Sequence, residues 1–435
     1  MHKAIFLDRD GVLIKNEKEQ VHKIEDFELY PDVVNGLRDL KDYKLFVVTN
    51  QPGPAKGIYT KEQSKEFNNY MKKELYKHGI VLTDIYSCYH HPKVSDCECR
   101  KPKPGMLLQA AREYNIDLKN SWMIGDRRSD IKAGQSAGCK TILVRTGDGG
   151  EGGDTDLGAK SDFIADNLNA AANIINNSEI QVLILAGGFG KRIAALAPNL
   201  PKPMIDIKGK PLLERQVEFF KQYGFTNYVF SLHYMPDVIK NYFGDGSKLG
   251  VNIKYAVESE PLGTGGAVKF CQNLINSEDF LLISGDVALN FDVNELVGLH
   301  RKNKSVVTPI VRVTDHPQDS DLYHVDENKK VSKLFKKKEG GEKYTNIGNT
   351  GLYIINKAIF NELSEGPSSL EHDTILPMIN KGLSVYVYMP KDGTFYIKDM
   401  GTPERYEKVI ADYDKWKLSK RWYILVFFLN YNSSD

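Results

Sequence analysis

The chain carries the stretch AIFLDRDG at residues 4–11, in which four apolar residues precede two carboxylates separated by one residue. The apolar run predicts a buried strand that places Asp8 and Asp10 at the carboxyl edge of a sheet, where open α/β folds bind ligands. One carboxylate can attack phosphorus and form an acyl phosphate. The other can protonate the leaving oxygen and then activate water. The stretch therefore favours phosphoryl chemistry on an aspartate over the alternative of surface acids in a turn.

Three further segments predict polar groups at the same edge of the sheet. They are Thr49-Asn50-Gln51 after an expected strand at 45–48, the cationic pair Arg100-Lys101, and the string GDRRSD at 125–130 after an expected strand at 122–124. They supply a hydroxyl, amides, cations for a phosphoryl group and more carboxylates. Crowded carboxylates next to a phosphate require a cation, and oxygen ligands favour Mg²⁺.

In this order the segments resemble the haloacid dehalogenase phosphatases. The resemblance implies that Asp8 is the nucleophile and Asp10 the acid/base catalyst. It implies that Thr49 and Lys101 hold the phosphoryl group. Mg²⁺ would be held by Asp8, the carbonyl of Asp10 and Asp126. The substrate contacts that we expect in addition are Asn50, Gln51, Arg100 and Arg127.

Three of the five cysteines lie close together, and their spacing predicts a metal site. Cys88 and His90 are separated by one residue, as are Cys97 and Cys99. Three thiolates and one imidazole make a closed tetrahedral zinc site, which is structural and not catalytic. His91 is the competing imidazole, and the family resemblance favours His90. The other interpretation is a chance grouping of buried cysteines.

Residues 1 to about 175 resemble the D-glycero-D-manno-heptose 1,7-bisphosphate 7-phosphatases. The resemblance rests on the zinc segment CECRKPKPGM at 97–106 together with the motifs at 8–11, 21–22 and 49–51. The histidinol-phosphate phosphatases share most of these motifs. Arg127 stands where lysine is usual, which keeps the charge, and Pro54 stands where an aliphatic residue is common.

After position 180 the alternation of apolar runs and amphipathic segments starts again, with expected strands at 182–186, 228–232, 253–257 and 280–284. Such alternation indicates parallel sheets covered by helices, so we expect an α/β chain of two doubly wound domains. The glycine cluster at 147–153 is interpreted as an internal loop, because a strand at 162–165 and a helix at 168–175 are expected after it. The expected domains are 1–178 and 180–415, followed by an apolar tail at 416–435.

The second half begins with a glycine-rich turn, AGGFGKR at 186–192, directly after a strand. Such a turn lets backbone N–H groups approach phosphates closely. It matches neither the Walker loop nor the dinucleotide fingerprint. The segments that follow it are PKPM at 201–204, EPLGTGGA at 260–267, SGD at 284–286 and DMGTP at 399–403.

This series resembles the sugar-1-phosphate nucleotidyltransferases over roughly residues 180–412, which implies a Rossmann-like second domain after a haloacid dehalogenase-like Rossmannoid first domain. The implied nucleotide contacts are Gly187, Gly188, Gly190, Lys191, Arg192, Gly263 and Gly265. Lys202 would bridge the reacting phosphates, and Asp286 and Asp399 would bind Mg²⁺. Asn349 and Glu371 would face the sugar hydroxyls. Threonine is usual where Lys191 stands.

The stretch 201–266 is most similar to D-glycero-α-D-manno-heptose 1-phosphate guanylyltransferases. The two halves then fit one route: removal of the C7 phosphate from a heptose bisphosphate, followed by transfer of a nucleotide, GMP from GTP, to C1. The alternatives are another sugar, the use of ATP, CTP or UTP, a phosphatase of the histidinol-phosphate type, or a scaffold protein with inactive sites.

Composition limits the other functions that the chain could have. Its 435 residues carry a formal charge of +1, which gives no support for a nucleic-acid surface. No apolar stretch reaches the ~20 residues of a membrane helix; the nearest lies at 422–429. Without a recognisable export signal, we expect a cytoplasmic enzyme with small-molecule substrates, Mg²⁺ in both domains and structural Zn²⁺ in the first. Assembly into a homo-oligomer is left open.

Overall fold

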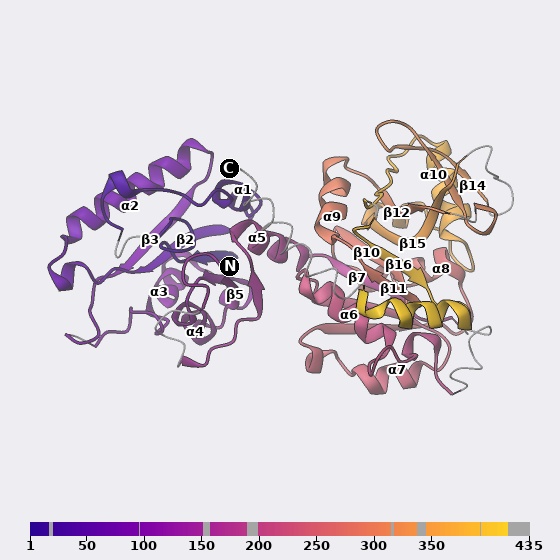
Figure 1. The fold of residues 1–435 in the computed structure, drawn as a ribbon, viewed down its shortest axis with the longest axis horizontal. Helices are drawn as coiled ribbons and strands as arrows, with labels where there is room; N and C mark the ends of the chain where they lie inside the picture. Colours follow the sequence, from indigo (N-terminus) through magenta and orange to yellow (C-terminus); the bar gives the residue numbers. More distant parts are fainter. Residues whose placement is uncertain are drawn as a thin grey trace. The chain divides into compact units, whose positions relative to one another are not determined.

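The computed structural model describes residues 1–16, 21–94, 96–150, 157–188, 199–314, 317–336, 345–391 and 393–415. The chain divides into two compact units, Met1–Asn176 and Asn177–Asp435 (Figure 1). Each is described by itself. The apolar tail expected at 416–435 lies outside the described residues. Among those residues, no helix is both long and apolar enough to cross a membrane.

The first unit is a six-stranded sheet in the order β3-β2-β1-β4-β5-β6, and every neighbouring pair is parallel. The strands are β1 (Ala4–Leu7), β2 (Lys44–Asn50), β3 (Leu82–Cys88), β4 (Trp122–Gly125), β5 (Lys140–Val144) and β6 (Phe163–Ala165). The helices are α1 (Val33–Arg38), α2 (Lys61–Lys77), α3 (Gly105–Tyr114), α4 (Arg128–Ala137) and α5 (Leu168–Asn177). The helix expected at 168–175 continues to Asn177.

The apolar run of β1 is buried on both faces, as expected for a central parallel strand. Successive side chains alternate between the faces. Ile5 and Leu7 pack into a core with residues of α1, α2 and α5, whereas Ala4 and Phe6 pack into a second core with residues of α3 and α4 (Figure 1). Helices on both faces confirm the doubly wound architecture, in which the carboxyl ends of the strands remain available for a site.

The second unit contains an eight-stranded sheet in the order β14-β13-β15-β10-β7-β8-β9, with β12 also paired to β15. A separate two-stranded sheet joins β11 to β16. The strands are β7 (Gln181–Leu185), β8 (Asn227–Leu232), β9 (Asn252–Val257), β10 (Asp279–Ser284), β11 (Val287–Asn290), β12 (Val307–Val313), β13 (Leu322–Val325), β14 (Val331–Phe335), β15 (Ile347–Asn356) and β16 (Tyr396–Asp399). The helices are α6 (Leu212–Gln222), α7 (Pro236–Phe243), α8 (Gly263–Phe270), α9 (Val293–Lys302) and α10 (Leu376–Asn380).

Only part of this second sheet is parallel. The four strands expected from the sequence, β7 to β10, pair in parallel. In contrast, β15 pairs antiparallel with β10, with β12 and with β13. Val182 and Ile184 face a core with α6, α7 and α9, whereas Leu183 faces a core with α8 and α10. The α/β class is thus confirmed, with an antiparallel extension that the sequence analysis does not predict.

Candidate active sites

The first site lies at the carboxyl ends of β1, β2 and β4. Asp8 follows β1, Asp126 follows β4, and Asp130 lies in the first turn of α4. One carboxylate oxygen from each of the three lies within 4.8 Å of the others, and all three residues are buried. Three buried carboxylates at this spacing form an oxygen-rich cluster of the kind that suits Mg²⁺.

Lys101 is the cation of this cluster. Its ammonium lies 3.0 Å from Asp8 and 2.6 Å from Asp130, and it also donates to the Val48 carbonyl at 2.7 Å. Burial alone would lower the pKa of Lys101, but the two carboxylates outweigh burial and raise the pKa above its ordinary value. The lysine is therefore charged and positioned next to the predicted nucleophile.

The cluster still carries more negative than positive charge. Burial, together with the charges of Asp8 and Asp130, raises the pKa of Asp126 to about 8. Asp126 Oδ1 is buried and has no hydrogen-bond partner among the described residues. A divalent cation at this point would supply both the missing charge and the missing partner, so the residues present fit Mg²⁺.

Asp130 also belongs to this cluster, although no separate role was predicted for it from the sequence. Its carboxylate accepts from the backbone N–H of Arg127 at 3.1 Å, which caps α4, and it also pairs with Lys101. A Cβ at Gly125 would lie 2.2 Å from the Asp130 Cβ, so the glycine that precedes Asp126 makes room for it. The signal was present in the GDRRSD string, but sequence alone does not show which acid meets the lysine.

The predicted acid/base residue, Asp10, is held by Arg9 and Gln51. The guanidinium of Arg9 lies 3.0 Å from the Asp10 carboxylate, and the Gln51 amide donates to it at 2.6 Å. Arg9 is fully buried, with its guanidinium over the face of Phe67. The Tyr59 hydroxyl donates to the Gln51 carbonyl oxygen at 2.7 Å. The carboxylate of Asp10 therefore has a fixed orientation.

Two residues expected to contact substrate, Asn50 and Gln51, form hydrogen bonds within the protein. Gln51 is buried, and both ends of its amide are bonded within the protein. The Asn50 side chain forms two bonds with the backbone of Lys101, at 3.0 and 3.1 Å. Asn50 and Gln51 therefore hold Lys101 and Asp10 in place, and their contact with substrate stays a prediction. Arg100, which donates to the His90 carbonyl, and Arg127, whose side chain is 51% exposed, remain candidates for a substrate phosphate.

The four predicted zinc ligands come together beside this site. Their ligand atoms lie within 4.8 Å of one another, with Sγ···Sγ distances of 3.2 to 3.8 Å. These separations are too long for a disulfide and near the ~3.8 Å edge of a zinc–thiolate tetrahedron. His90 Nδ1 lies 3.2 Å from Cys99 Sγ, whereas His91 Nδ1 accepts from the backbone of Lys93. The geometry therefore favours His90 over His91.

The second site lies beyond the carboxyl end of β10. The ammonium of Lys202 forms an ion pair with Asp286. Asp399 ends β16, which is paired to β11 so that Val287 lies opposite Asp399. Arg405 lies 2.6 Å from Asp399 and, with the charge of Lys202, outweighs burial to lower the pKa of that carboxyl. Lys202 and the two predicted metal ligands thus occupy one region.

A second polar group contains the two predicted sugar contacts, Asn349 and Glu371. Asn349 lies 3.5 Å from this carboxylate, which also accepts from the Tyr353 hydroxyl at 2.6 Å and from Thr264 at 3.2 Å. The sequence analysis does not name Tyr353 or Thr264. Tyr353 lies four residues beyond Asn349 on the same strand, and only the fold brings both to Glu371.

Two of the glycines expected at the nucleotide, Gly263 and Gly265, lie close to another segment of the chain. A Cβ at Gly263 would lie 2.5 Å from the Ser368 carbonyl oxygen, and one at Gly265 would lie 2.7 Å from Ser368 Oγ. The segment at 368–370 therefore leaves no room for a side chain at either glycine. Their contact with a nucleoside stays a prediction. Gly187 and Gly188 follow β7, whereas Gly190, Lys191 and Arg192 lie outside the described residues.

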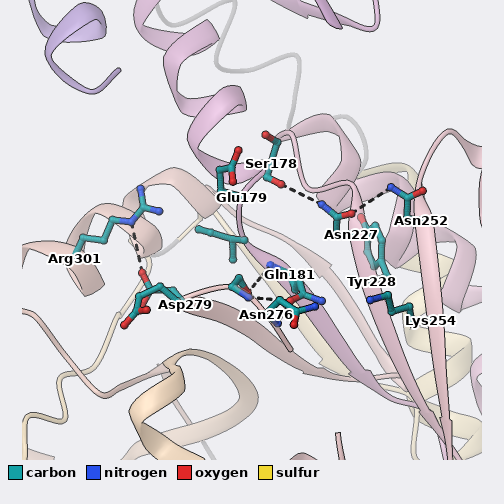
Figure 2. A pocket seen from close by; sticks show the side chains of 13 residues that line it. Ser178, Glu179, Gln181, Asn227, Tyr228, Asn252, Lys254, Asn276, Asp279 and Arg301 are labelled. Carbon is teal, nitrogen blue, oxygen red and sulfur yellow. Dashed lines mark hydrogen bonds and ion pairs between the residues drawn. The ribbon is translucent and has the colours of Figure 1, made fainter. Parts of the chain in front are cut away.

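A polar cavity of about 500 Å³ lies at the amino ends of strands β7 to β10, in the large sheet of the second unit (Figure 2). Its lining includes the first residues of β7, β8, β9 and β10: Gln181, Asn227, Asn252 and Asp279. These side chains bond one another or nearby backbone, as in the bonds of Asn227 with Ser178 and Asn252 (Figure 2). This cavity therefore lies away from Lys202 and Asp286 and belongs to neither site.

The second unit matches a known protein family over nearly its whole described length. The nucleotidyl transferase family model matches residues 181–415, more than half of the chain. The chain belongs to the nucleotidyl transferase family. A HAD-hydrolase-like model matches residues 98–171 of the first unit.

The relatives of the first unit are phosphatases. D-glycero-alpha-D-manno-heptose-1,7-bisphosphate 7-phosphatase of Photorhabdus laumondii is 42% identical over 154 residues, which is 33% of this chain and 84% of that protein. D-glycero-beta-D-manno-heptose-1,7-bisphosphate 7-phosphatase of Pasteurella multocida is 44% identical over 155 residues, which is 34% of this chain and 84% of that protein. This nucleotidyl transferase thus carries a member of the heptose-bisphosphate phosphatase family on the same chain.

Solved structures are similar to each unit. HddC from Yersinia pseudotuberculosis is 30% identical and covers 54% of this chain and 99% of its own, with a TM-score of 0.46. The heptose 1,7-bisphosphate phosphatase from B. bronchiseptica, complexed with magnesium and phosphate, is 31% identical and covers 39% of this chain and 96% of its own, with a TM-score of 0.36. The family matches confirm the prediction of two enzymes on one chain, a phosphatase and a nucleotidyltransferase.

Proposed function

We propose that this enzyme removes the C7 phosphate from a D-glycero-D-manno-heptose 1,7-bisphosphate and then transfers GMP from GTP to the resulting heptose 1-phosphate. The observation that carries the proposal is the pairing of families on one chain. A 7-phosphatase leaves a sugar 1-phosphate, which is the kind of substrate that a sugar nucleotidyltransferase consumes. Both reactions use cytosolic metabolite classes, phosphorylated sugars and nucleoside triphosphates, so we place them in the cytoplasm.

In the first reaction a carboxylate oxygen of Asp8 attacks the C7 phosphorus. The bond to the sugar oxygen breaks, and Asp10 gives that oxygen a proton. Asp10, now a carboxylate, then takes a proton from the water that hydrolyses the acyl phosphate. Lys101 neutralises charge on the transferred group throughout. Asp8, the Asp10 carbonyl and Asp126 would hold Mg²⁺, which would supply further positive charge.

In the second reaction a phosphate oxygen of the sugar 1-phosphate attacks the α-phosphorus of GTP, and pyrophosphate leaves. The protein forms no covalent intermediate, so it acts by positioning and charge neutralisation. Lys202 would bridge the reacting phosphates. Asp286 and Asp399 would hold the Mg²⁺ that accompanies the triphosphate, and Asn349 and Glu371 would bind sugar hydroxyls.

The test is a one-pot reaction with the purified chain, Mg²⁺ and each anomer of the heptose bisphosphate. We expect one phosphate and one pyrophosphate released for each GDP-heptose formed, with GTP favoured over ATP, CTP and UTP. Fructose 1,6-bisphosphate serves as a control sugar that carries two phosphates in a different arrangement. Phosphate release without a nucleotide sugar from any triphosphate would contradict the linked reactions, and a better yield with another triphosphate would reassign the base.

We also propose that Cys88, His90, Cys97 and Cys99 bind structural Zn²⁺ and thereby set the pose of the loop that carries Arg100 and Lys101. Replacing Cys97 by serine should remove about one zinc per chain. It should also lower the Tm of the first unit by about 5–10 °C, because metal binding contributes directly to folding. In a domain of this size, 1 kcal/mol of stability corresponds to ~2–4 °C in Tm. Metal analysis and calorimetry measure both. Cys139→Ser, at a buried cysteine outside the cluster, is the control for zinc content. Unchanged zinc in Cys97→Ser would contradict the site.

A further inference from the structure

The glycine cluster after β5 is described as far as Gly150, and it lies against the carboxylate cluster. The backbone N–H of Asp148 donates to Asp126 Oδ2 at 2.8 Å. The backbone N–H of Gly150 donates to the Asp126 carbonyl at 2.7 Å. A segment that resembles a flexible linker in the sequence is therefore bonded to a metal-ligand candidate.

Two glycines enclose the Asp126 carboxylate. A Cβ at Gly147 would lie 2.2 Å from Asp126 Oδ2, and a Cβ at Gly11 would lie at the same distance from that oxygen. The Thr146 hydroxyl donates to the Gly11 carbonyl at 2.6 Å and joins the two glycine segments. A side chain at either glycine would displace the carboxylate, since contacts this short do not occur.

The two carboxylate oxygens of Asp126 differ in their hydrogen bonding. Oδ2 accepts the amide of Asp148, whereas Oδ1 is buried without a partner among the described residues. Outer contacts of this kind orient a metal ligand and leave one lone pair for the metal.

The same segment also holds a cation. The Asp148 carboxylate lies 2.5 Å from the guanidinium of Arg127, the residue next to Asp126 and a candidate for binding a substrate phosphate. Asp148 thus contacts the candidate metal ligand Asp126 through its backbone N–H and contacts Arg127 through its side chain.

We propose that Thr146–Asp148 form a clamp that positions Asp126 for Mg²⁺ and Arg127 for a phosphate of the substrate. The proposal rests on the proposed magnesium site and adds to it a loop whose residues are positioning residues. The Gly147 and Asp148 backbone acts on metal affinity, and the Asp148 carboxylate acts on substrate affinity.

The experiment compares three single variants of the full chain, each with Asp286→Asn and Asp399→Asn added so that Mg²⁺ is titrated at the first site alone. Gly147→Ala places a methyl group against Asp126. Gly149→Ala is the matched control, because its φ of +57° is close to the +59° of Gly147 while its Cβ would come no nearer than 3.3 Å to another atom. Asp148→Asn keeps the backbone amide and removes the charge that faces Arg127.

Calorimetric titration should show Mg²⁺ binding weakened about 10–100-fold in Gly147→Ala, the range typical of lost outer-shell contacts, and changed less than about 3-fold in the other two. At saturating Mg²⁺, Asp148→Asn should raise KM for the bisphosphate about 5-fold with kcat nearly unchanged, since a binding contact is loosened. Tm without Mg²⁺ reports folding, and Thr146→Val, which removes the bond to Gly11, is a milder variant should Gly147→Ala not fold.

The clamp would be overturned if Gly147→Ala and Gly149→Ala bound Mg²⁺ with equal affinity. If Gly147→Ala is unfolded, equal Mg²⁺ affinities of Thr146→Val and the parent would overturn it instead. An unchanged KM in Asp148→Asn would overturn the part that concerns Arg127. If the parent itself bound no Mg²⁺ at this site, the proposed metal site would fail, which is a different result from failure of the clamp.

Discussion

Replacing Asp8 by asparagine should reduce release of phosphate from heptose bisphosphate by about 10³-fold or more, because an amide cannot form the acyl phosphate intermediate. Asparagine has nearly the same shape and removes a negative charge from a cluster in which three carboxylates face one lysine. The fold of the first unit should therefore survive the change. Phosphate release under saturating substrate and Mg²⁺, with circular dichroism as the check on folding, measures the effect.

The same variant separates the two activities of the chain. When heptose 1-phosphate is supplied, Asp8→Asn should form nucleotide sugar at the parent rate, since the transferase residues belong to the other unit. Asp42→Asn, at an exposed position in the first unit, is the matched control and should leave phosphate release unchanged. Undiminished phosphate release by Asp8→Asn would contradict Asp8 as the nucleophile and revive the alternative of a scaffold protein with inactive sites.

Replacing Lys202 by methionine should lower nucleotide-sugar formation by about 10²–10³-fold, the cost of removing one preorganised charge from a site that acts mainly by electrostatics. Methionine preserves most of the length of the side chain and leaves Asp286 without its ion pair. Pyrophosphate release in the presence of heptose 1-phosphate and GTP measures the rate.

The prediction for Lys202 has its own internal control. Release of phosphate from the bisphosphate should be unaffected, so the variant should accumulate heptose 1-phosphate. Lys254→Met replaces an exposed lysine at the opposite edge of the same sheet and should be without effect on either reaction. A Lys202→Met enzyme that kept its transfer rate would remove this lysine from the reaction and leave the family assignment intact.

Local patterns in the sequence were sufficient for much of the first unit. The apolar run of β1 and the two carboxylates after it are neighbours in the chain, so the strand and the sheet edge follow from a few residues. The cysteine and histidine spacing likewise predicted a four-ligand group that the fold brings together. In the second unit the parallel strands β7, β8 and β10 were found because each contains a short apolar run, and β9 because its polar and apolar residues alternate.

Contacts between distant segments required the tertiary structure. The sequence contains Asp130 and Lys101 but does not show that they meet, and it contains Gly147 without showing that it lies on Asp126. The antiparallel strands around β15 were not predicted. Along β15 itself, buried and partly buried residues do not alternate regularly. The sequence likewise does not show that the amide of Gln51 is bonded to Asp10 and Tyr59. By itself, the sequence determined the reactive groups and the strands that carry them, because both are local. The fold decided which side chain orients which, because such pairs are formed only when remote segments pack together.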